Sequence, residues 1–342
     1  MAILDHRSLL DESGWLRRDV GLVSMGDHFD WGGTNERERA ARSGQELLAW
    51  LAAHSPEQVI LILGNHDLGR VGELLGFDDD AFAVAHAEAV RAYRDGDVAE
   101  ESERQLLARF PALPTAELAA RDFAAFCSDQ RDQVTALLRA GRFRIAAARG
   151  PILLCHAGIT VDDIAAIASD GDPAPDAAAI AGLLNRALDQ RVAQWAGDAP
   201  LDLPGLHRPG DSDLGEGGGI FYHRPSNPEH ERDPGLFAGR YARRYDARRI
   251  PRGVVQVIGH IGDGKCRKLL GPWAVGEPAP VGALRHLAIH GESVSYQTGL
   301  PATWPALDAV DDGALMIFTD GAMRKSAPEE YQLLQLSGRP IV

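Results

Sequence analysis

Val59-Ile60-Leu61-Ile62-Leu63-Gly64-Asn65-His66-Asp67 is an apolar run that ends in a glycine turn followed by polar side chains. Five consecutive apolar residues bounded by a turn are typical of a strand in a sheet that is covered on both faces. The apolar spacing predicts a helix over residues 36–54, before this strand. A shorter buried strand is predicted over residues 20–25, after a helix that begins at residue 2 and ends near residue 10. Alternation of helices with such strands predicts an α/β fold.

The rest of the chain continues this pattern, with two interruptions. Ala, Glu, Asp, Arg and Leu dominate residues 70–140, and we expect a mostly helical insertion or cap there, within a single domain over residues 1–342. Residues 161–200 are also predicted helical, and residues 203–236 form a Pro/Gly-rich loop long enough to be functional. Further strands are predicted over residues 143–147, 151–155, 254–258, 284–290 and 314–319.

Composition narrows the class of protein. A formal charge of −14 argues against non-specific binding to nucleic acid or to anionic lipid, both of which need a basic surface. No apolar run is long enough to cross a bilayer, and the first residues lack a signal-peptide pattern. Three scattered cysteines are too few for a disulfide framework. We therefore expect a cytoplasmic protein that binds neither nucleic acid nor membrane.

Four of the predicted apolar strands end in polar turns of related composition. The turns are Gly26-Asp27, Gly64-Asn65, His156-Ala157-Gly158 and Gly259-His260. Ligand sites in α/β sheets collect at the carboxyl ends of strands, so these ends are predicted to lie at one edge.

The four polar residues form a plausible metal-ligand set. A carboxylate (Asp27), an amide oxygen (Asn65) and two imidazoles (His156, His260) suit Mn, Fe or Zn. Each residue alone is more often an ordinary turn or core residue, but the combination and its order favour a metal site.

Together these motifs resemble those of the calcineurin-like metallophosphoesterases. The series Gly-Asp-x-x-Asp, Gly-Asn-His-Asp, His-Ala-Gly and Gly-His is closest to the branch of Ser/Thr phosphatases and dinucleoside-tetraphosphatases. Phe318-Thr319-Asp320-Gly321-Ala322 is a looser likeness to the strand end that closes the domain in that branch. The resemblance implies a four-layer α-β-β-α sandwich and a hydrolase that acts on phosphate esters.

The resemblance also implies roles for single residues. Asp27 would bridge two divalent metal ions, and Asn65, His156 and His260 would complete the second metal position. His66 would be the general acid that protonates the leaving oxygen, oriented by Asp30, while metal-activated water attacks phosphorus.

The sequence departs from the family at its first motif. The family opens with a strand that ends in Asp-x-His and supplies the first metal, and Gly26 is too near the start for that strand to precede it. We expect either that Met1 begins inside the domain or that the first metal position is incomplete. An incomplete site leaves a second hypothesis open, a metal-binding pseudoenzyme or scaffold.

Two further positions bear on phosphate binding. Trp31 stands where many phosphatases of this branch have an Arg, which removes one phosphate clamp. Arg224, in Tyr222-His223-Arg224-Pro225, is the candidate phosphate-binding residue; the alternative is a surface Arg on a flexible loop.

Three further residues near the motifs, Lys265, Cys266 and His28, are open to an ordinary structural interpretation as well as a functional one. The basic cluster around Lys265 either meets substrate phosphate or is a solvated hairpin. Basic neighbours would lower the pKa of Cys266, without making it catalytic. His28 is interpreted as a solvated turn residue, and the alternative is that it reaches substrate or metal-bound water.

The predicted substrate is a phosphomonoester or a phosphoprotein, given the acidic charge. A dinucleoside polyphosphate stays open, because a helical insertion would suit a cap over a small substrate.

Overall fold

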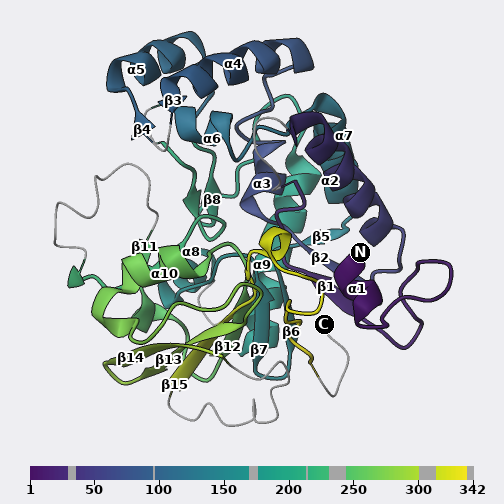
Figure 1. Cartoon of the computed structure of the whole chain (residues 1–342), viewed down its shortest axis with the longest axis vertical. Helices are drawn as coiled ribbons and strands as arrows, with labels where there is room; N and C mark the ends of the chain where they lie inside the picture. Colours follow the sequence, from purple (N-terminus) through teal and green to yellow (C-terminus); the bar gives the residue numbers. More distant parts are fainter. Residues whose placement is uncertain are drawn as a thin grey trace.

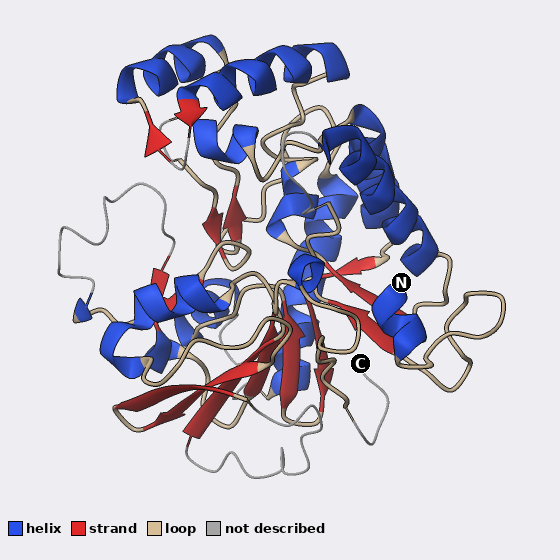
Figure 2. Ribbon diagram, in the orientation of Figure 1, coloured by secondary structure: helices blue, strands red, loops and turns tan. Residues whose placement is uncertain are grey.

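The computed structural model describes residues 1–29, 36–94, 97–168, 176–212, 215–230, 244–299 and 313–336. Within these residues the chain is an α/β protein with two principal sheets and helices around them, which confirms the predicted α/β class (Figures 1 and 2). No helix in the described part of the chain is long and apolar enough to cross a membrane.

The smaller sheet has three parallel strands in the order β1-β2-β5. These strands are β1 (Leu22–Ser24), β2 (Val59–Ile62) and β5 (Phe143–Arg144). Two of them confirm the strands predicted over residues 20–25 and 59–63. The strand predicted over residues 143–147 is wrong as one unit, because the chain changes sheets at Ile145 and continues as β6 (Ala146–Arg149) in the larger sheet.

The larger sheet has six strands in the order β14-β13-β15-β12-β7-β6. Besides β6, they are β7 (Ile152–Cys155), β12 (Val255–Ile258), β13 (Arg285–His290), β14 (Ser293–Thr298) and β15 (Gly313–Phe318). β12 lies parallel to both β7 and β15, whereas β13 and β14 form an antiparallel hairpin. The sequence did not predict β14, because its polar residues give an edge strand without an apolar run.

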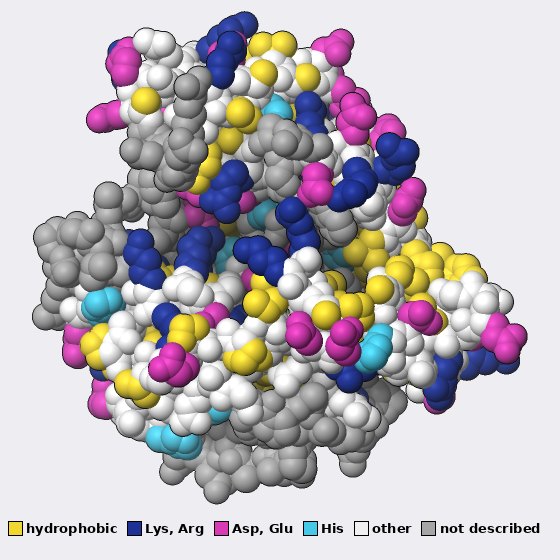
Figure 3. Space-filling model, viewed as in Figure 1, with side chains coloured by type: hydrophobic (Ala, Val, Ile, Leu, Met, Phe, Trp, Pro, Cys, Tyr) yellow, Lys and Arg dark blue, Asp and Glu magenta, His cyan; other side chains and the backbone are white. Residues whose placement is uncertain are grey.

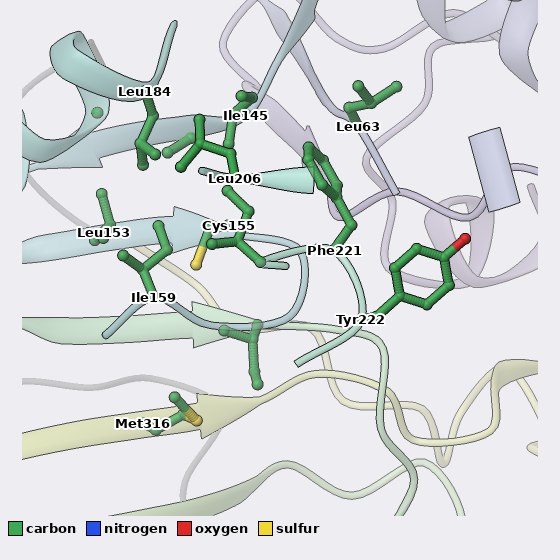
Figure 4. Packing of buried hydrophobic residues seen from close by; sticks show 14 of the residues in the cluster. Leu63, Ile145, Leu153, Cys155, Ile159, Leu184, Leu206, Phe221, Tyr222 and Met316 are labelled. Carbon is green, nitrogen blue, oxygen red and sulfur yellow. The ribbon is translucent and has the colours of Figure 1, made fainter. Parts of the chain in front are cut away.

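The two sheets share one hydrophobic cluster. Alternate residues of their strands meet in it, among them Ile62, Leu154, Val257 and Ile317. The intervening residues belong to a second, larger cluster that includes the surrounding helices, and Figure 4 shows part of it. Burial on both faces explains why these strands are continuous apolar runs rather than alternating ones.

Helices cover the outer sides of the sheets. α2 (Arg37–Ala52) packs on β2 and against α7 (Ser128–Arg139), and α9 (Ala177–Gln194) packs on β6 and β7. α8 (Val161–Ile167) begins with a capping box formed by Thr160 and Asp163. α1 (Ala2–His6) is shorter than predicted.

Residues 70–140 contain helices with a hydrophobic cluster of their own. α4 (Asp79–Ala92), α5 (Glu100–Arg109) and α6 (Ala116–Ala120) pack around phenylalanines such as Phe82 and Phe123, and a short strand pair, β3 (Tyr93–Arg94) and β4 (Asp97–Val98), joins α4 to α5. These helices stand apart from the sheets at one end of the molecule (Figure 1). We call α4, α5 and α6 the upper helices.

The Pro/Gly-rich segment predicted as a loop contains short strands. They are β8 (His207–Arg208), β9 (Gly218–Gly219) and β10 (Arg224–Ser226), and β10 pairs with β11 (Arg244–Asp246). Gly219 has a φ of +91°, and a Cβ there would collide with the backbone of Leu206. Glycine is therefore required where β9 lies against β8. Residues 231–236 of the predicted loop lie outside the described residues.

The described residues also contain three 3-10 turns. They are η3 (Ala247–Arg249), η4 (Gly271–Trp273) and η5 (Met323–Lys325). η4 follows α10 (Asp263–Leu270), and α10 packs on β10.

Candidate metal centre

The four predicted ligand residues lie together where four strands end. Asp27 follows β1 and Asn65 follows β2, in the smaller sheet. His156 follows β7 and His260 follows β12, in the larger sheet. The site is thus built at the meeting edges of two sheets, because both sheets direct the carboxyl ends of these strands to the same place.

The side-chain oxygen of Asn65 is at the centre of this group. Asn65 Oδ1 lies 2.9 Å from His156 Nε2 and 3.1 Å from His260 Nδ1. His156 Nε2 also lies 3.4 Å from Asp27 Oδ2. One ligand atom from each of Asp27, His156 and His260 lies within 4.8 Å of the others, a spacing that a single metal ion could span.

The hydrogen-bonding chemistry of this group fits a cation. His156 Nδ1 lies 2.8 Å from the Met25 carbonyl, which can only accept, so Nδ1 carries the proton. Nε2 of the neutral ring then presents a lone pair to Asn65 Oδ1 and Asp27 Oδ2, which are acceptors too. His260 Nε2 is buried and has no hydrogen-bond partner within the described residues. A second proton on His156, a reversed Asn65 amide or a metal ion would offset these converging lone pairs.

The surroundings lower the pKa values of Asp27 and His260 and raise the pKa of His156. Burial would raise the pKa of Asp27, but His156, His66 and His260 outweigh it and hold that pKa well below its usual value. Burial opposes a charge on His156 as well, yet Asp27 raises its pKa. Burial lowers the pKa of His260 far below its usual value, and Arg224 and His156 add to that effect. The unprotonated His260 imidazole and the ionised Asp27 are the forms that bind metal.

The backbone at two of the ligands is held in the left-handed region. The φ angles of Asp27 and His260 are 58° and 63°, a conformation that costs about 1–2 kcal/mol for a residue with a side chain. Gly26 precedes Asp27 with a φ of 94°, and a Cβ there would lie 2.7 Å from the Gly64 Cα. The two turns are therefore packed backbone to backbone, which brings Asp27 close to Asn65.

Asp67 holds these two turns together. Its carboxylate accepts hydrogen bonds from the backbone N–H groups of Asp27 (3.1 Å), His28 (3.0 Å) and Gly64 (2.9 Å). In the opposite direction, Asp27 Oδ1 accepts from the backbone N–H of His66 at 3.0 Å. Asp67 is fully buried, so these bonds are protected from water.

His28 completes the support around Asp67. Its Nδ1 lies 3.0 Å from both Asp67 oxygens, and its Nε2 lies 2.8 Å from Ser24 Oγ. The interpretation of His28 as a solvated turn residue is wrong, because only 1% of its side chain is exposed. Its partner is 39 residues away in the chain, so local turn chemistry contained no signal for the pair.

His66 is buried beside this support. Its ring meets edge-on the ring of Phe123, a residue of the hydrophobic cluster around the upper helices, with 6.1 Å between ring centroids. Its carbonyl accepts from Arg70 Nη1 at 2.8 Å. Arg70 is itself buried over the Phe29 ring, at 4.9 Å. The predicted partner Asp30 lies outside the described residues, and so does Trp31.

Arg224 is buried, with 6% of its surface exposed, which excludes the alternative of a surface Arg. Its Nη1 lies 2.5 Å from Glu216 Oε1 and donates to the Tyr222 carbonyl at 3.2 Å. The Nε of Arg224 has no hydrogen-bond partner within the described residues. Because Arg224 also lowers the pKa of His260, the guanidinium lies near the candidate metal centre.

The segment after His260 is not the solvated hairpin that was one of its two interpretations from sequence. The residues around Lys265 form α10 (Asp263–Leu270) and not a hairpin. Burial raises the pKa of the Cys266 thiol to about 12, although the charge of Arg285 opposes this rise. The predicted lowering of that pKa is therefore wrong, and Cys266 is an unreactive thiol of the core.

Glu73 is a buried carboxyl that contacts the segment containing β8, β9 and β10. Its Oε1 accepts from the backbone N–H of Gly210 at 2.8 Å and from the Tyr222 hydroxyl at 2.9 Å, which ties the segment after α3 (Asn65–Gly69) to the β8–β10 region. Burial raises the pKa of Glu73, and hydrogen bonds from Gly210 and Tyr222 offset only part of the rise.

Glu73→Gln is expected to reduce the loss of stability on going from about pH 5 to about pH 8. A carboxyl with a raised pKa in the folded state contributes stability below its unfolded pKa, and that contribution is lost as pH rises through the folded pKa. Thermal unfolding at the two pH values measures the difference. Glu46→Gln, on an exposed part of α2, is the control; an identical pH dependence in wild type, control and Glu73→Gln would show that Glu73 does not titrate in this way.

The surface above the site is basic in spite of the acidic chain. Figure 3 shows Lys and Arg side chains gathered around a hollow between the upper helices and the sheets, with His side chains inside it. This local charge is suited to an anionic substrate.

Comparison with protein-family models, with curated proteins and with solved structures finds no match to this chain.

Proposed function

We propose that this chain is a divalent-metal phosphoesterase of the calcineurin-like kind, with a metal ion held by Asp27, Asn65, His156 and His260. The observation that carries the proposal is the convergence of four acceptor side chains from four strand ends. The cluster shared by the two sheets supports the four-layer α-β-β-α sandwich implied by the motifs.

The donor set of oxygen and imidazole nitrogen suits Mn, Fe or Zn. When bound, such ions supply positive charge to the phosphoryl oxygens and make water more acidic. If two ions bind, Asp27 would be the ligand that holds both, because its carboxylate has two oxygens and no other carboxylate joins this group among the described residues.

The remaining roles belong to protein side chains around the phosphate. Arg224 would orient it, because its Nε is buried, lacks a partner in the described part of the chain and lies near His260. His66 would donate a proton to the leaving oxygen, with Asp30 as the group that orients it. The buried position of His66 beside Phe123 would keep bulk water away from that transfer.

A phosphomonoester or a phosphoprotein is the proposed substrate class, and neither nucleic acid nor membrane is a proposed partner. The hollow in Figure 3 offers local positive charge, while the acidic remainder of the chain opposes long polyanions. We place the protein in the cytoplasm, as its three free thiols suggest.

Arg224→Met is expected to reduce kcat/KM for a phosphomonoester by about tenfold to a hundredfold, the effect of losing a charge-assisted contact. Steady-state phosphate release from p-nitrophenyl phosphate with Mn²⁺ measures it. The double variant Arg224→Met/Glu216→Gln avoids leaving Glu216 as an unpaired buried charge, and Glu216→Gln alone is the matched control. Equal kcat/KM in the control and the double variant would remove Arg224 from the phosphate site.

A metal-binding pseudoenzyme or scaffold is the second candidate function. The observation that favours it is that the described residues contain one cluster of metal-ligand side chains, which is enough for one ion. Metal content measured together with phosphate release separates the two functions. Bound metal in protein that hydrolyses no phosphate ester would favour the scaffold.

A further inference from the structure

A buried ring from the region of the upper helices packs on the proposed general acid. Phe123 follows α6 and belongs to the hydrophobic cluster around the upper helices, where it is fully buried. Its ring meets the ring of His66 edge-on, with 6.1 Å between the centroids and 71° between the planes. His66 belongs to α3, which lies between the upper helices and the smaller sheet (Figure 1). The helical insertion therefore supplies part of the wall around a residue of the candidate site.

The backbone of α3 leaves room for this ring. Gly69 lies three residues after His66, on the same side of the helix. A Cβ at Gly69 would lie 2.9 Å from Phe123 Cε1 and 3.0 Å from Phe123 Cζ, closer than van der Waals contact allows. Glycine is a poorer helix former than alanine. Here it stands where a larger residue would push Phe123 away from His66.

Arg70 connects the same ring to the backbone of His66. Its guanidinium lies 5.7 Å from the centre of the Phe123 ring and 4.9 Å from the centre of the Phe29 ring. Nη1 donates to the His66 carbonyl at 2.8 Å, and Nε donates to Gln130 Oε1 at 3.1 Å. Arg70 and Gln130 are both fully buried, so these bonds are shielded from water. The main chain of His66 is thus fixed by Arg70, and its ring is packed by Phe123.

The direction of the imidazole matters for a proton donor. A general acid has to place its N–H within hydrogen-bond reach of the leaving oxygen. A histidine ring can turn about its side-chain bonds unless its neighbours prevent it. Aromatic rings prefer the edge-to-face arrangement that Phe123 makes here, so the contact favours one orientation of the His66 ring.

We propose that Phe123 is a positioning residue for His66, which holds the imidazole in the orientation from which it protonates the leaving oxygen. In that step water forms the new bond to phosphorus, and the bond to the leaving oxygen breaks with its electron pair. The proton of His66 neutralises that oxygen, and a proton of the attacking water restores His66. The inference rests on the proposed function and narrows its substrate class to esters whose leaving oxygen is too basic to depart without a proton.

The test compares two phosphate esters as substrates of the Mn²⁺-loaded protein. Phe123→Leu should lower kcat for phenyl phosphate by about tenfold, and kcat for p-nitrophenyl phosphate by no more than about twofold. The reason is that p-nitrophenolate departs without a proton, whereas phenolate is a more basic leaving group. Gly69→Ala, which displaces the Phe123 ring from the side of α3, should give the same difference between the esters. Initial rates of phosphate release at saturating substrate measure both variants.

Phe126→Leu is the matched control. Phe126 is another buried phenylalanine of the same hydrophobic cluster, and its ring meets Phe82 with 4.9 Å between centroids. Loss of that ring should lower the unfolding temperature about as much as Phe123→Leu does, but should affect the two esters equally. His66→Gln completes a double-mutant cycle, because on that background Phe123→Leu should cause no further loss with phenyl phosphate.

The outcomes separate the positioning role from the proposed function. If His66→Gln slows phenyl phosphate hydrolysis but Phe123→Leu affects the two esters equally, Phe123 has no positioning role and the phosphoesterase stands. The same conclusion follows if the losses from Phe123→Leu and His66→Gln multiply in the double variant. If the folded wild-type protein with Mn²⁺ releases phosphate from neither ester, the proposed function fails and the inference fails with it.

Discussion

Asp27→Asn should lower Mn²⁺-dependent phosphate release by about a thousandfold or more, while the protein stays folded. Asp27 is the carboxylate of the ligand group, and its removal takes away the negative charge that holds the cation against two histidines. The amide of Asn can still accept the hydrogen bond that the His66 backbone gives to Asp27 Oδ1, so the turn should survive. Initial rates with p-nitrophenyl phosphate measure the loss.

Asp5→Asn is the matched control for this substitution. Asp5 is exposed on α1, and the same change of charge there should leave the rate unaltered. Thermal unfolding of both variants shows whether the fold is intact. A folded Asp27→Asn protein with the rate of the Asp5→Asn protein would sink the assignment of Asp27 as a metal ligand.

Asp67→Asn is predicted to have the largest effect on stability, a loss of about 3–5 kcal/mol in the free energy of unfolding. The buried carboxylate accepts three backbone N–H groups and the ring of His28, and an amide would replace one acceptor oxygen by a donor. Burial would raise the pKa of Asp67, but His28 outweighs it and lowers that pKa, so the native structure relies on the ionised form. Urea unfolding measures the change.

The same substitution should also weaken metal binding by about tenfold to a hundredfold, because Asp67 fixes the turn that presents Asp27. Asp163→Asn distinguishes this effect from general destabilisation. Asp163 is another buried carboxylate, and it accepts from the backbone N–H of Thr160 at 2.8 Å in the capping box of α8. We expect its loss to lower stability and leave the affinity for Mn²⁺ unchanged. Equal Mn²⁺ affinities in the two variants would mean that Asp67 supports the fold and not the site.

The strand-end rule explains why the ligand group could be predicted from sequence. Asp27, Asn65, His156 and His260 each follow a short apolar run, and such runs end at a common edge whichever sheet they join. The rule can be applied without knowing the order of the strands in a sheet. The four residues could therefore be grouped correctly although two of their strands belong to one sheet and two to the other.

The support around the ligands could not be predicted in this way. The burial of His28 depends on Asp67, and that of Arg224 depends on a Glu216 held by a glycine-rich turn. Both are tertiary pairs between polar residues, and neither leaves a periodic pattern in the sequence. The division of residues 143–149 between β5 and β6 was missed for a related reason, because a change of sheet at Ile145 leaves the apolar pattern unbroken.

Titration of the metal-free protein with Mn²⁺, with phosphate release measured in the same samples, tests the proposed centre most directly. We predict that the wild-type chain binds at least one ion tightly and releases phosphate only when it is bound. His156→Ala and His260→Ala should lose both properties together, since both rings lie against Asn65 Oδ1. A folded wild-type protein that binds no Mn²⁺, Fe²⁺ or Zn²⁺, or variants that bind metal as tightly as the wild type, would contradict the metal centre on which the proposed function depends.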